Sequence, residues 1–340
     1  AMRHGVLNGG KRLRPFLVLE SAALFSADGE AALRGAAALE CVHCYSLIHD
    51  DLPAMDDDDL RRGQPTVHKA FDEAAAILAG DALLTLSFDI LADEATPLAA
   101  ERRAALVLAM ARAAGLGGMA GGQMLDLDAG RDRPDEAGVI TLQAMKTGAL
   151  IRFACEAGPV IAGAPAADRE RLAEFGSAVG LAFQLADDLL DLTADPGTLG
   201  KATGKDVGAG KATLVALHGE RWARGQLDGL VGQARELLAP YGERAALLND
   251  ANRHLINFYR QLQAGLLISF EMANDSDLYY RHRRRFNQII AEGQADTPEA
   301  AGLFYYLNRT GYNGLCRFNQ SGGFNVPFGR YKTISYTTDF

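Results

Sequence analysis

Two short segments rich in aspartate contain the side chains of this chain best suited to chemistry. The first runs from Asp50 to Asp59, and the second is the five-residue segment 187–191. Carboxylates this close together repel one another, so they ionise together only where cations neutralise their charge. Mg²⁺ prefers such oxygen ligands and often bridges carboxylates to phosphate oxygens. The two clusters therefore predict magnesium sites that hold a phosphate-containing ligand.

The spacing of the polar residues in the second cluster predicts that they share one face of a helix. Gln184, Asp187, Asp188 and Asp191 are spaced i, i+3, i+4 and i+7, which places them on one face of a helix. A solvated acidic surface is the alternative for either cluster, because runs of charge are usually just surface. Two clusters that each follow an apolar helix favour the metal site.

The first cluster follows a helix of the same kind. The residues that share one face before it are His43, Ser46, Leu47 and Asp50. Pro53 should end this helix, because proline cannot donate the next backbone hydrogen bond. We therefore expect Asp56 to approach Asp50 from the following turn.

Lysine and arginine residues elsewhere supply positive charge for phosphate ligands. Three of them, Lys11, Arg12 and Arg14, open one predicted helix, and the others are Lys146, Lys201, Lys205 and Lys211. Each alone is typical of a protein surface. Together with the aspartate clusters they predict two polyphosphate ligands, one held through metal and one by direct contact with cations.

The elements that position these residues belong to a chain of 340 residues that is 48% hydrophobic. That content excludes intrinsic disorder. The chain has 34 basic and 43 acidic residues, a net charge of −9, which excludes a uniformly basic nucleic-acid binder. No uninterrupted apolar run has the length of a membrane span, so we expect none. No secretory leader opens the chain, and four cysteines do not suggest a disulfide framework, so a cytoplasmic location is expected. Cys41 and Cys44 lack a second pair and are expected to be core residues, not zinc ligands.

Composition changes sharply near residue 248. Residues 1–247 contain 51 Ala, one Asn and nine Phe plus Tyr, with 24 basic and 35 acidic residues, net −11. Residues 248–340 contain 7 Ala, nine Asn and sixteen Phe plus Tyr, with 10 basic and 8 acidic residues, net +2. We therefore predict two units of different origin, 1–247 and 248–340.

The expected fold is mainly all-α. Ala and Leu dominate residues 1–247, and their apolar residues recur at spacings of three and four, which predicts a helical bundle. Residues 251–264, 275–292 and 298–308 are also predicted helices. After them, 315–319 and 324–328 are strand-like and flank Gln320-Ser321-Gly322-Gly323, which predicts a β-hairpin.

Residues 1–247 resemble a trans-isoprenyl diphosphate synthase of the bacterial farnesyl diphosphate synthase type. The matching motifs, in chain order, are GGKRLRP, HDDLPAMDDDDLRRG, MKTGAL, FQLADDLLD and LGKATGKD. The resemblance implies an all-helical bundle around a deep cavity, with the two aspartate motifs facing each other across its mouth. It also implies a bundle without the family's first and last helices, because few residues precede Lys11 and the segment after Leu247 differs.

The resemblance implies the roles of the site residues. Three Mg²⁺ ions would be held by Asp50, Asp51, Asp56, Asp187, Asp188 and Asp191. The allylic diphosphate would also contact Arg61, Lys146 and Lys201, and isopentenyl diphosphate would contact Lys11, Arg14, His43 and Arg62. Lys211 would also bind substrate, and Thr147 and Gln184 would support the cationic carbon.

The product length is expected to depend on the residues before Asp50. Tyr45 and Ser46 precede it on the same helix, and Pro53-Ala54 widen the first motif by two residues. Both features resemble the subtype that makes the fifteen-carbon product. An ordinary core aromatic is the alternative for Tyr45.

Residues 249–340 resemble a second family, the adenine-specific DNA methylases that act at GATC-like sites. The matching segments are NDANRHLINFYRQL and LFYYLNRTGYNGLCRFNQSGGFNVPFGRYK. The resemblance implies a target-recognition region whose DNA contacts, within 310–332, would be Asn313, Arg317, Asn319, Pro327 and Arg330. Arg and Asn suit that role, since they bind base edges and phosphates. The family's glycine-rich loop and Asp/Asn-Pro-Pro-Tyr motif are not found in this chain, so S-adenosylmethionine binding and methyl transfer are not expected.

Three hypotheses follow. The first is a Mg²⁺-dependent prenyltransferase that makes farnesyl diphosphate, with the family's homodimer as its candidate assembly. The second is a DNA-binding fragment carried on a helical scaffold. The third is a chimeric chain with no single evolved function, because intact fusions usually keep both catalytic cores.

Overall fold

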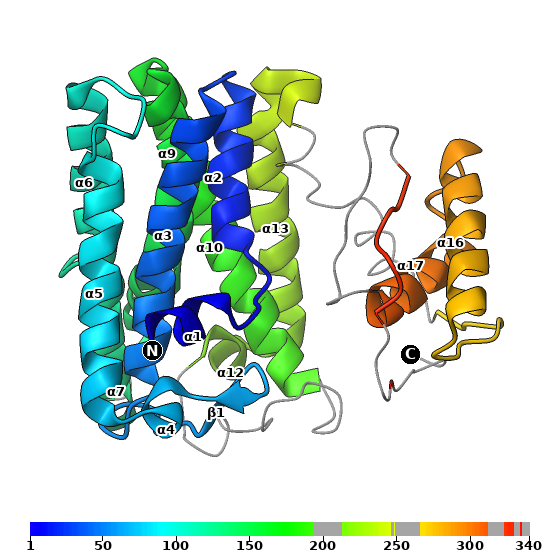
Figure 1. Ribbon diagram of the computed structural model, residues 1–340, viewed down its shortest axis with the longest axis horizontal. Helices are drawn as coiled ribbons and strands as arrows, with labels where there is room; N and C mark the ends of the chain where they lie inside the picture. Colours follow the sequence, from blue (N-terminus) through cyan, green and yellow to red (C-terminus); the bar gives the residue numbers. More distant parts are fainter. Residues whose placement is uncertain are drawn as a thin grey trace. The chain divides into compact units, whose positions relative to one another are not determined.

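The structure is a computed structural model of the 340-residue chain, and it describes residues 1–132, 134–193, 213–245, 248, 266–311, 323–329 and 334. Contacts between residues divide the chain into two compact units, Ala1–Asn249 and Asp250–Phe340. Figure 1 colours both units along the sequence.

The first unit is a helical bundle, as the sequence predicted (Figure 1). Its elements are α1 (Met2–Leu7), α2 (Leu13–Leu24), α3 (Gly29–Asp50), β1 (Leu60–Arg61), β2 (Gln64–Pro65), α4 (Val67–Ala70), α5 (Glu73–Ala92), α6 (Ala100–Ala114), α7 (Met119–Asp132), α8 (Glu136–Gln143), the π-helical turn η1 (Ala144–Gly148), α9 (Ala149–Ala162), α10 (Ala166–Thr193), α12 (Leu214–His218), α13 (Glu220–Leu238) and the 3-10 helix η2 (Ala239–Ala245).

Aspartate caps begin several of these helices. The side chains of Asp28, Asp72 and Asp135 accept hydrogen bonds from backbone N–H groups in the first turns of α3, α5 and α8. Such a cap satisfies a donor that has no partner within the helix, and each is worth about 1 kcal/mol. The acidic composition of the bundle thus has a structural use besides the two clusters.

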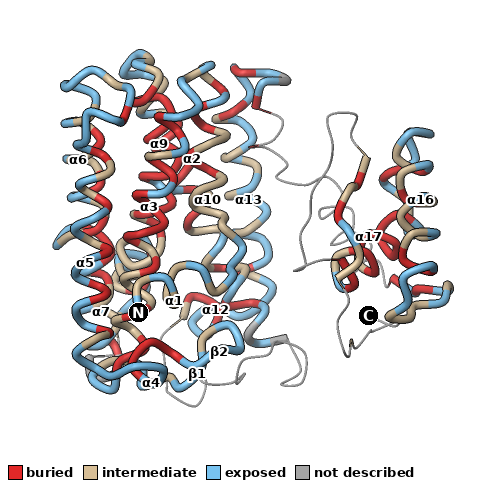
Figure 2. The backbone as a smooth tube through the Cα atoms, in the orientation of Figure 1, coloured by how far each residue is buried: buried red, intermediate tan, exposed pale blue. Residues whose placement is uncertain are grey.

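Buried apolar side chains fill the space between the central helices. The faces of α2, α3 and α9 that meet are buried, which Figure 2 shows as red segments inside the bundle. Their core includes Val18, Leu39, Val42 and Phe153, each at most 2% exposed. Because α3 lies among several neighbours, its last turn, where Asp50 lies, is held firmly in place.

The outer helices leave apolar side chains exposed. Among the described residues, Glu73–Ala92 and Ala100–Ala129 are long and apolar enough to cross a membrane by length and composition, and 33% and 28% of their most apolar stretches are buried. Charged residues interrupt both segments, which is why the sequence shows no continuous apolar run of that length. Core helices pass the same test, and α5 packs on α3 and α6 in the bundle.

A small hairpin follows the first aspartate cluster. Strands β1 and β2 pair antiparallel, with Leu60 opposite Pro65 and Arg61 opposite Gln64. The two turn residues, Arg62 and Gly63, have φ of 55° and 76°, the left-handed conformation that such tight turns need. The hairpin brings Arg61 back toward the end of α3.

The bundle core continues to the end of the first unit. Leu238, Tyr241, Ala245 and Leu248 are buried in the same core as α2 and α9. The Tyr241 hydroxyl donates a 2.7 Å hydrogen bond to Asp168 Oδ1. The segment after α13 is therefore part of the bundle.

The second unit contains α16 (Ser276–Ala291) and α17 (Pro298–Thr310), which confirms the predicted helices 275–292 and 298–308. Their core includes Tyr279, Phe286, Tyr306 and Phe324. Gly311 and Phe328 form an isolated antiparallel bridge. The predicted helix 251–264 and the strand 315–319 lie outside the described residues.

Candidate functional site

The first aspartate cluster folds back on the end of α3. The N–H of Asp56 donates a 2.8 Å hydrogen bond to the carbonyl of Asp50, and the N–H of Asp58 donates to the carbonyl of Asp51 at 3.2 Å. The expected approach of Asp56 to Asp50 is therefore present in the backbone. Burial, and to a lesser extent the neighbouring Asp56 and Asp51, raise the pKa of Asp50 to about 6 against the opposing effect of Lys146. Asp50 thus lies where a nearby cation favours its charged form.

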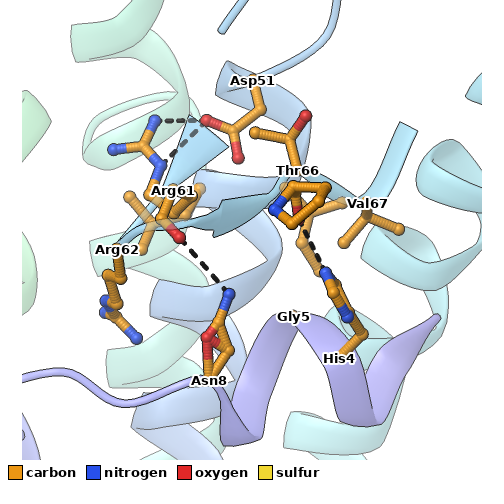
Figure 3. A pocket seen from close by; sticks show the side chains of 11 residues that line it. His4, Gly5, Asn8, Asp51, Arg61, Arg62, Thr66 and Val67 are labelled. Atoms are coloured by element: carbon orange, nitrogen blue, oxygen red, sulfur yellow. Dashed lines mark hydrogen bonds and ion pairs between the residues drawn. The ribbon is translucent and has the colours of Figure 1, made fainter. Parts of the chain in front are cut away.

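The two members of the pair Asp50-Asp51 face different surroundings. Asp51 is 3% exposed, and its carboxylate accepts hydrogen bonds from Arg61 on β1. Figure 3 shows this pair beside a pocket between α1 and the hairpin. Asn8, which directly follows α1, donates to the Arg61 carbonyl, and His4 of α1 contacts the Pro65 carbonyl, so this segment holds the hairpin that carries Arg61 in place (Figure 3).

The second cluster, at the end of α10, also has one buried aspartate beside a more accessible one. Asp187 is exposed, whereas Asp188 is 8% exposed. Gln143 of α8 donates to Asp188 Oδ2 at 3.0 Å, and Gln184 donates to Asp188 Oδ1 at 3.3 Å. Gln184 therefore holds a carboxylate in this structure. Asp191 lies in the last turn of α10, and its side chain is outside the described residues.

The π-helical turn η1 links the two clusters. Lys146 lies near Asp50, whose pKa it lowers, and its Nζ pairs with Asp126 Oδ2 of α7 at 2.5 Å. Gln143, three residues earlier, binds Asp188. A Cβ on Gly122 of α7 would lie 2.2 Å from the Lys146 backbone nitrogen, so only glycine allows this approach. Single π turns within helices are frequent at functional sites, and half-buried Thr147 lies in this one.

A second group of cations lies along α2 and α3. Arg14 Nη1 is 3.4 Å from His43 Nε2, and the Arg62 side chain donates to the Gly9 carbonyl at 2.5 Å. Burial, and to a lesser extent the positive charges of Arg14 and Arg62, lower the pKa of His43 to about 2. His43 is therefore neutral at pH 7 and acts through hydrogen bonds. Lys11 is exposed at the edge of this group.

Tyr45 lies on α3 between the cations and the first cluster. It is half-buried and packs against the bundle core. Its ring meets the His49 ring edge to face, with 5.8 Å between the two ring centroids. Ser46, beside it, donates its hydroxyl to the His43 carbonyl at 2.9 Å. Both residues proposed to affect product length therefore lie one turn before Asp50.

Several residues singled out in the sequence fall outside the described residues. They are Lys201, Lys205, Lys211, Asn313, Arg317, Asn319 and Arg330, and Pro327 is described and exposed. The site also contains residues that the sequence did not single out, among them Asp126, Gln143 and Glu40. Their only signal was a polar side chain within an apolar helical segment, and many polar side chains far from any site share that pattern.

The donor set suits Mg²⁺. Asp50 and Asp56 are neighbours, and Asp187 is exposed at the end of α10. Within the described residues, no three His, Cys, Asp or Glu side chains form a group that could hold a metal by themselves. Mg²⁺ fits such a site, because it usually takes one or two carboxylates and completes its shell with water and phosphate oxygens.

Two sequence families match this chain. Residues 1–238 match the polyprenyl synthetase family, and residues 238–339 match the D12 class N6 adenine-specific DNA methyltransferase family. Among curated proteins, farnesyl diphosphate synthase of Escherichia coli is 48% identical over 251 residues, which span 72% of this chain and 82% of that protein. The resemblances drawn from the two sets of motifs are confirmed by these matches.

Solved structures have the same fold as the bundle. An FPP/GFPP synthase from Zymomonas mobilis is 46% identical with a TM-score of 0.68, covering 75% of this chain and 86% of its own. A geranyltransferase from Helicobacter pylori, solved with magnesium and isoprenyl diphosphate, is 34% identical with a TM-score of 0.66, covering 76% and 87%. These similarities cover the unit that contains both aspartate clusters.

Proposed function

The chain belongs to the polyprenyl synthetase family, and from this we propose that it condenses isopentenyl diphosphate with dimethylallyl or geranyl diphosphate to give farnesyl diphosphate. The observation that carries the proposal is the placement of Asp50 beside Asp56, with Lys146 between this cluster and the partners of Asp188. Prenyl transfer is the activity of the relatives that match this unit.

We assign the allylic diphosphate to the two aspartate clusters. Asp50, Asp56 and Asp187 would hold Mg²⁺, together with Asp191, and three ions per site is the number proposed. Asp51 and Asp188 would act differently, by holding Arg61 and the α8–α10 contact in place. Arg61, Lys146 and Lys201 would contact the diphosphate directly, and Lys211 would also bind substrate.

The first chemical step is cleavage of the allylic carbon–oxygen bond. The electron pair leaves with the diphosphate, and an allylic cation remains. Bound Mg²⁺ supplies neutralisation of the charge on the departing diphosphate. Arg61 and Lys146 stabilise the same charge by direct contact, and the Thr147 hydroxyl lies in the turn next to Lys146, where its oxygen dipole supports the cation.

Isopentenyl diphosphate would occupy the second group of cations. Lys11, Arg14 and Arg62 would bind its diphosphate, and neutral His43 would donate a hydrogen bond. Its double bond attacks the allylic carbon, which forms the new carbon–carbon bond. A proton then leaves the condensed product for the departed diphosphate, which balances the charge.

The second unit supports a second candidate function, contact with DNA. Residues 238–339 match a DNA methyltransferase family. On α16, Arg283 donates to the Val326 carbonyl and Arg285 pairs with Glu299, while Arg281 and Arg284 are exposed. Arginine binds phosphate well. Contacts from Asn313, Arg317, Asn319, Pro327 and Arg330 remain part of this proposal.

The exposed apolar side chains of the bundle support a homodimer. Ile77, Leu78 and Leu86 of α5 and Leu108 of α6 are between 37% and 66% exposed. These side chains lie on two helices that pack together, and a contiguous apolar surface formed by them would mark an interaction site.

A cytoplasmic location is proposed as well, because Cys41, Cys44 and Cys155 are buried free thiols.

Removing one carboxylate from each cluster should abolish prenyl transfer. We expect Asp50→Ala and Asp187→Ala each to lower turnover of radiolabelled isopentenyl diphosphate by about 10³-fold, because the departing diphosphate loses its neutralising charge. The matched control is Asp57→Asn in the same loop. Asp57 is exposed with φ of 50°, which Asn tolerates, so its activity should stay near that of the unmodified chain. Full turnover by the Asp50→Ala, Asp187→Ala double variant would refute the assignment.

Shortening Tyr45 should lengthen the product. In Tyr45→Ala, the space beside α3 grows toward the bundle core, so a chain of more than fifteen carbons can fit. Thin-layer analysis of labelled products should show longer prenyl diphosphates, whereas Tyr45→Phe, which keeps the ring, should still stop at fifteen carbons. An unchanged product length in Tyr45→Ala would assign Tyr45 to packing alone.

DNA contact is tested by a gel shift of the full chain. If the second unit keeps sequence recognition, a duplex with GATC should bind more tightly than a scrambled duplex at equal salt, and Arg281→Ala with Arg284→Ala should weaken both. Arg285→Ala serves as the control, because that side chain is occupied by Glu299. Equal affinity for both duplexes would defeat sequence recognition.

A further inference from the structure

Glu40 of α3 is a buried carboxylate within the second group of cations. It is 8% exposed and lies one turn before His43 on the same helix face. Its Oε1 accepts a hydrogen bond from Arg12, and the Cys44 thiol lies 3.8 Å from the same oxygen. Its Oε2 is buried and has no hydrogen-bond partner. A buried carboxylate costs free energy unless nearby cations compensate for it, so its presence here calls for a reason.

Arg12 connects Glu40 to the segment that begins α2. Its backbone has φ of 52° at the N-cap of the helix, a left-handed conformation that is unfavourable for a non-glycine residue. Its guanidinium binds Glu40 on one side and donates to the Val6 carbonyl of α1 at 2.5 Å on the other. The Arg12–Glu40 pair thus fixes the turn between α1 and α2, which carries Lys11 and leads into Arg14.

Arg14 depends on the same carboxylate. Burial lowers the pKa of Arg14, and Glu40 is the largest influence that opposes this shift. Arg14 Nε is buried without a hydrogen-bond partner, as is Glu40 Oε2. With Arg12, Arg14 and Arg62 all acting on His43, like charges gather on this side of α3. Mutual repulsion would separate these side chains in the absence of a ligand if no negative charge lay among them.

We propose that Glu40 is a positioning residue of the isopentenyl diphosphate pocket, whose carboxylate holds Arg12 at the turn that carries Lys11 and keeps Arg14 where it receives the diphosphate of that substrate. This inference rests on the proposed function, because that function assigns the pocket to isopentenyl diphosphate. Glu40 acts through the arginines and does not itself contact the substrate.

The direction in which the affinity for isopentenyl diphosphate changes when Glu40 is replaced separates a positioning role from a simple effect of its charge. If Glu40 acted only through its field, removing its negative charge would strengthen binding of an anion. If it holds the arginines in place, removing it weakens binding even though the pocket becomes more positive. A purely structural role would lower the melting temperature and leave the two substrate affinities in the same ratio.

The test compares Glu40→Gln with the unmodified full chain. Calorimetry with isopentenyl diphosphate in the absence of Mg²⁺ should show a Kd about tenfold higher in the variant, a loss of roughly 1.4 kcal/mol. The KM for isopentenyl diphosphate should rise by a similar factor, while the KM for geranyl diphosphate changes less than about twofold. Glu20→Gln is the matched control, because Glu20 is a half-buried glutamate of α2 whose pKa is raised by burial alone, and it should leave both values unchanged.

Three further variants keep the result interpretable. Arg12→Gln and the double variant Arg12→Gln, Glu40→Gln should each bind isopentenyl diphosphate about as weakly as Glu40→Gln, because residues that act as one unit are not additive. Glu40→Asp, which keeps the charge, should recover part of the affinity if Glu40→Gln folds poorly. An equal or lower Kd in both Glu40 variants, additive losses in the double variant, or absence of binding by the unmodified chain would overturn the inference. If the unmodified chain binds isopentenyl diphosphate but makes no product, the proposed function fails while the Kd comparison still decides the role of Glu40.

Discussion

Consecutive residues of an α-helix point about 100° apart, and this constraint shapes both aspartate clusters. The side chains of Asp50 and Asp51 therefore point in different directions, and so do those of Asp187 and Asp188. In each pair the second carboxylate turns inward and is held by a neighbour, Arg61 for Asp51 and Gln143 for Asp188. The inward carboxylates attach the hairpin and α8 to the ends of α3 and α10, which leaves the outward ones available for metal. The acidic pairs therefore organise the surrounding elements as well as the site.

The sequence predicted the helical bundle, the location of both clusters and the approach of Asp56 to Asp50, since these follow from periodicity and from Pro53. It did not predict the partners of the inward carboxylates. Gln143 meets Asp188 across 45 positions of sequence and Arg12 meets Glu40 across 28, and no local pattern contains such a contact. The sequence also did not predict the hairpin of β1 and β2, although Gly63 at its turn is a residue that favours such turns. The π turn at Lys146 depends on the close approach of α7 at Gly122, which is a tertiary effect.

The two families that share this chain meet at residue 238, yet the bundle core extends further. Leu238, Tyr241, Ala245 and Leu248 recur at spacings of three and four and are all buried in the bundle. An apolar stripe with a helical period packs wherever it finds a complementary face, so the boundary between compact units follows packing, at 249 and 250. The predicted boundary at 247 and 248 rested on composition, and it stays a proposal. The first residues of the segment that matches the methyltransferase family are therefore part of the core of the prenyl synthetase bundle.

We propose that this bundle, joined to a second unit that matches another family, performs metal-dependent prenyl transfer. The most direct measurement incubates the full chain with geranyl diphosphate and labelled isopentenyl diphosphate, with Mg²⁺ and with a chelator, and separates the products by chain length. We expect a fifteen-carbon prenyl diphosphate that forms with Mg²⁺ and disappears with the chelator. No condensation product with Mg²⁺, or an equal yield with the chelator, would contradict it.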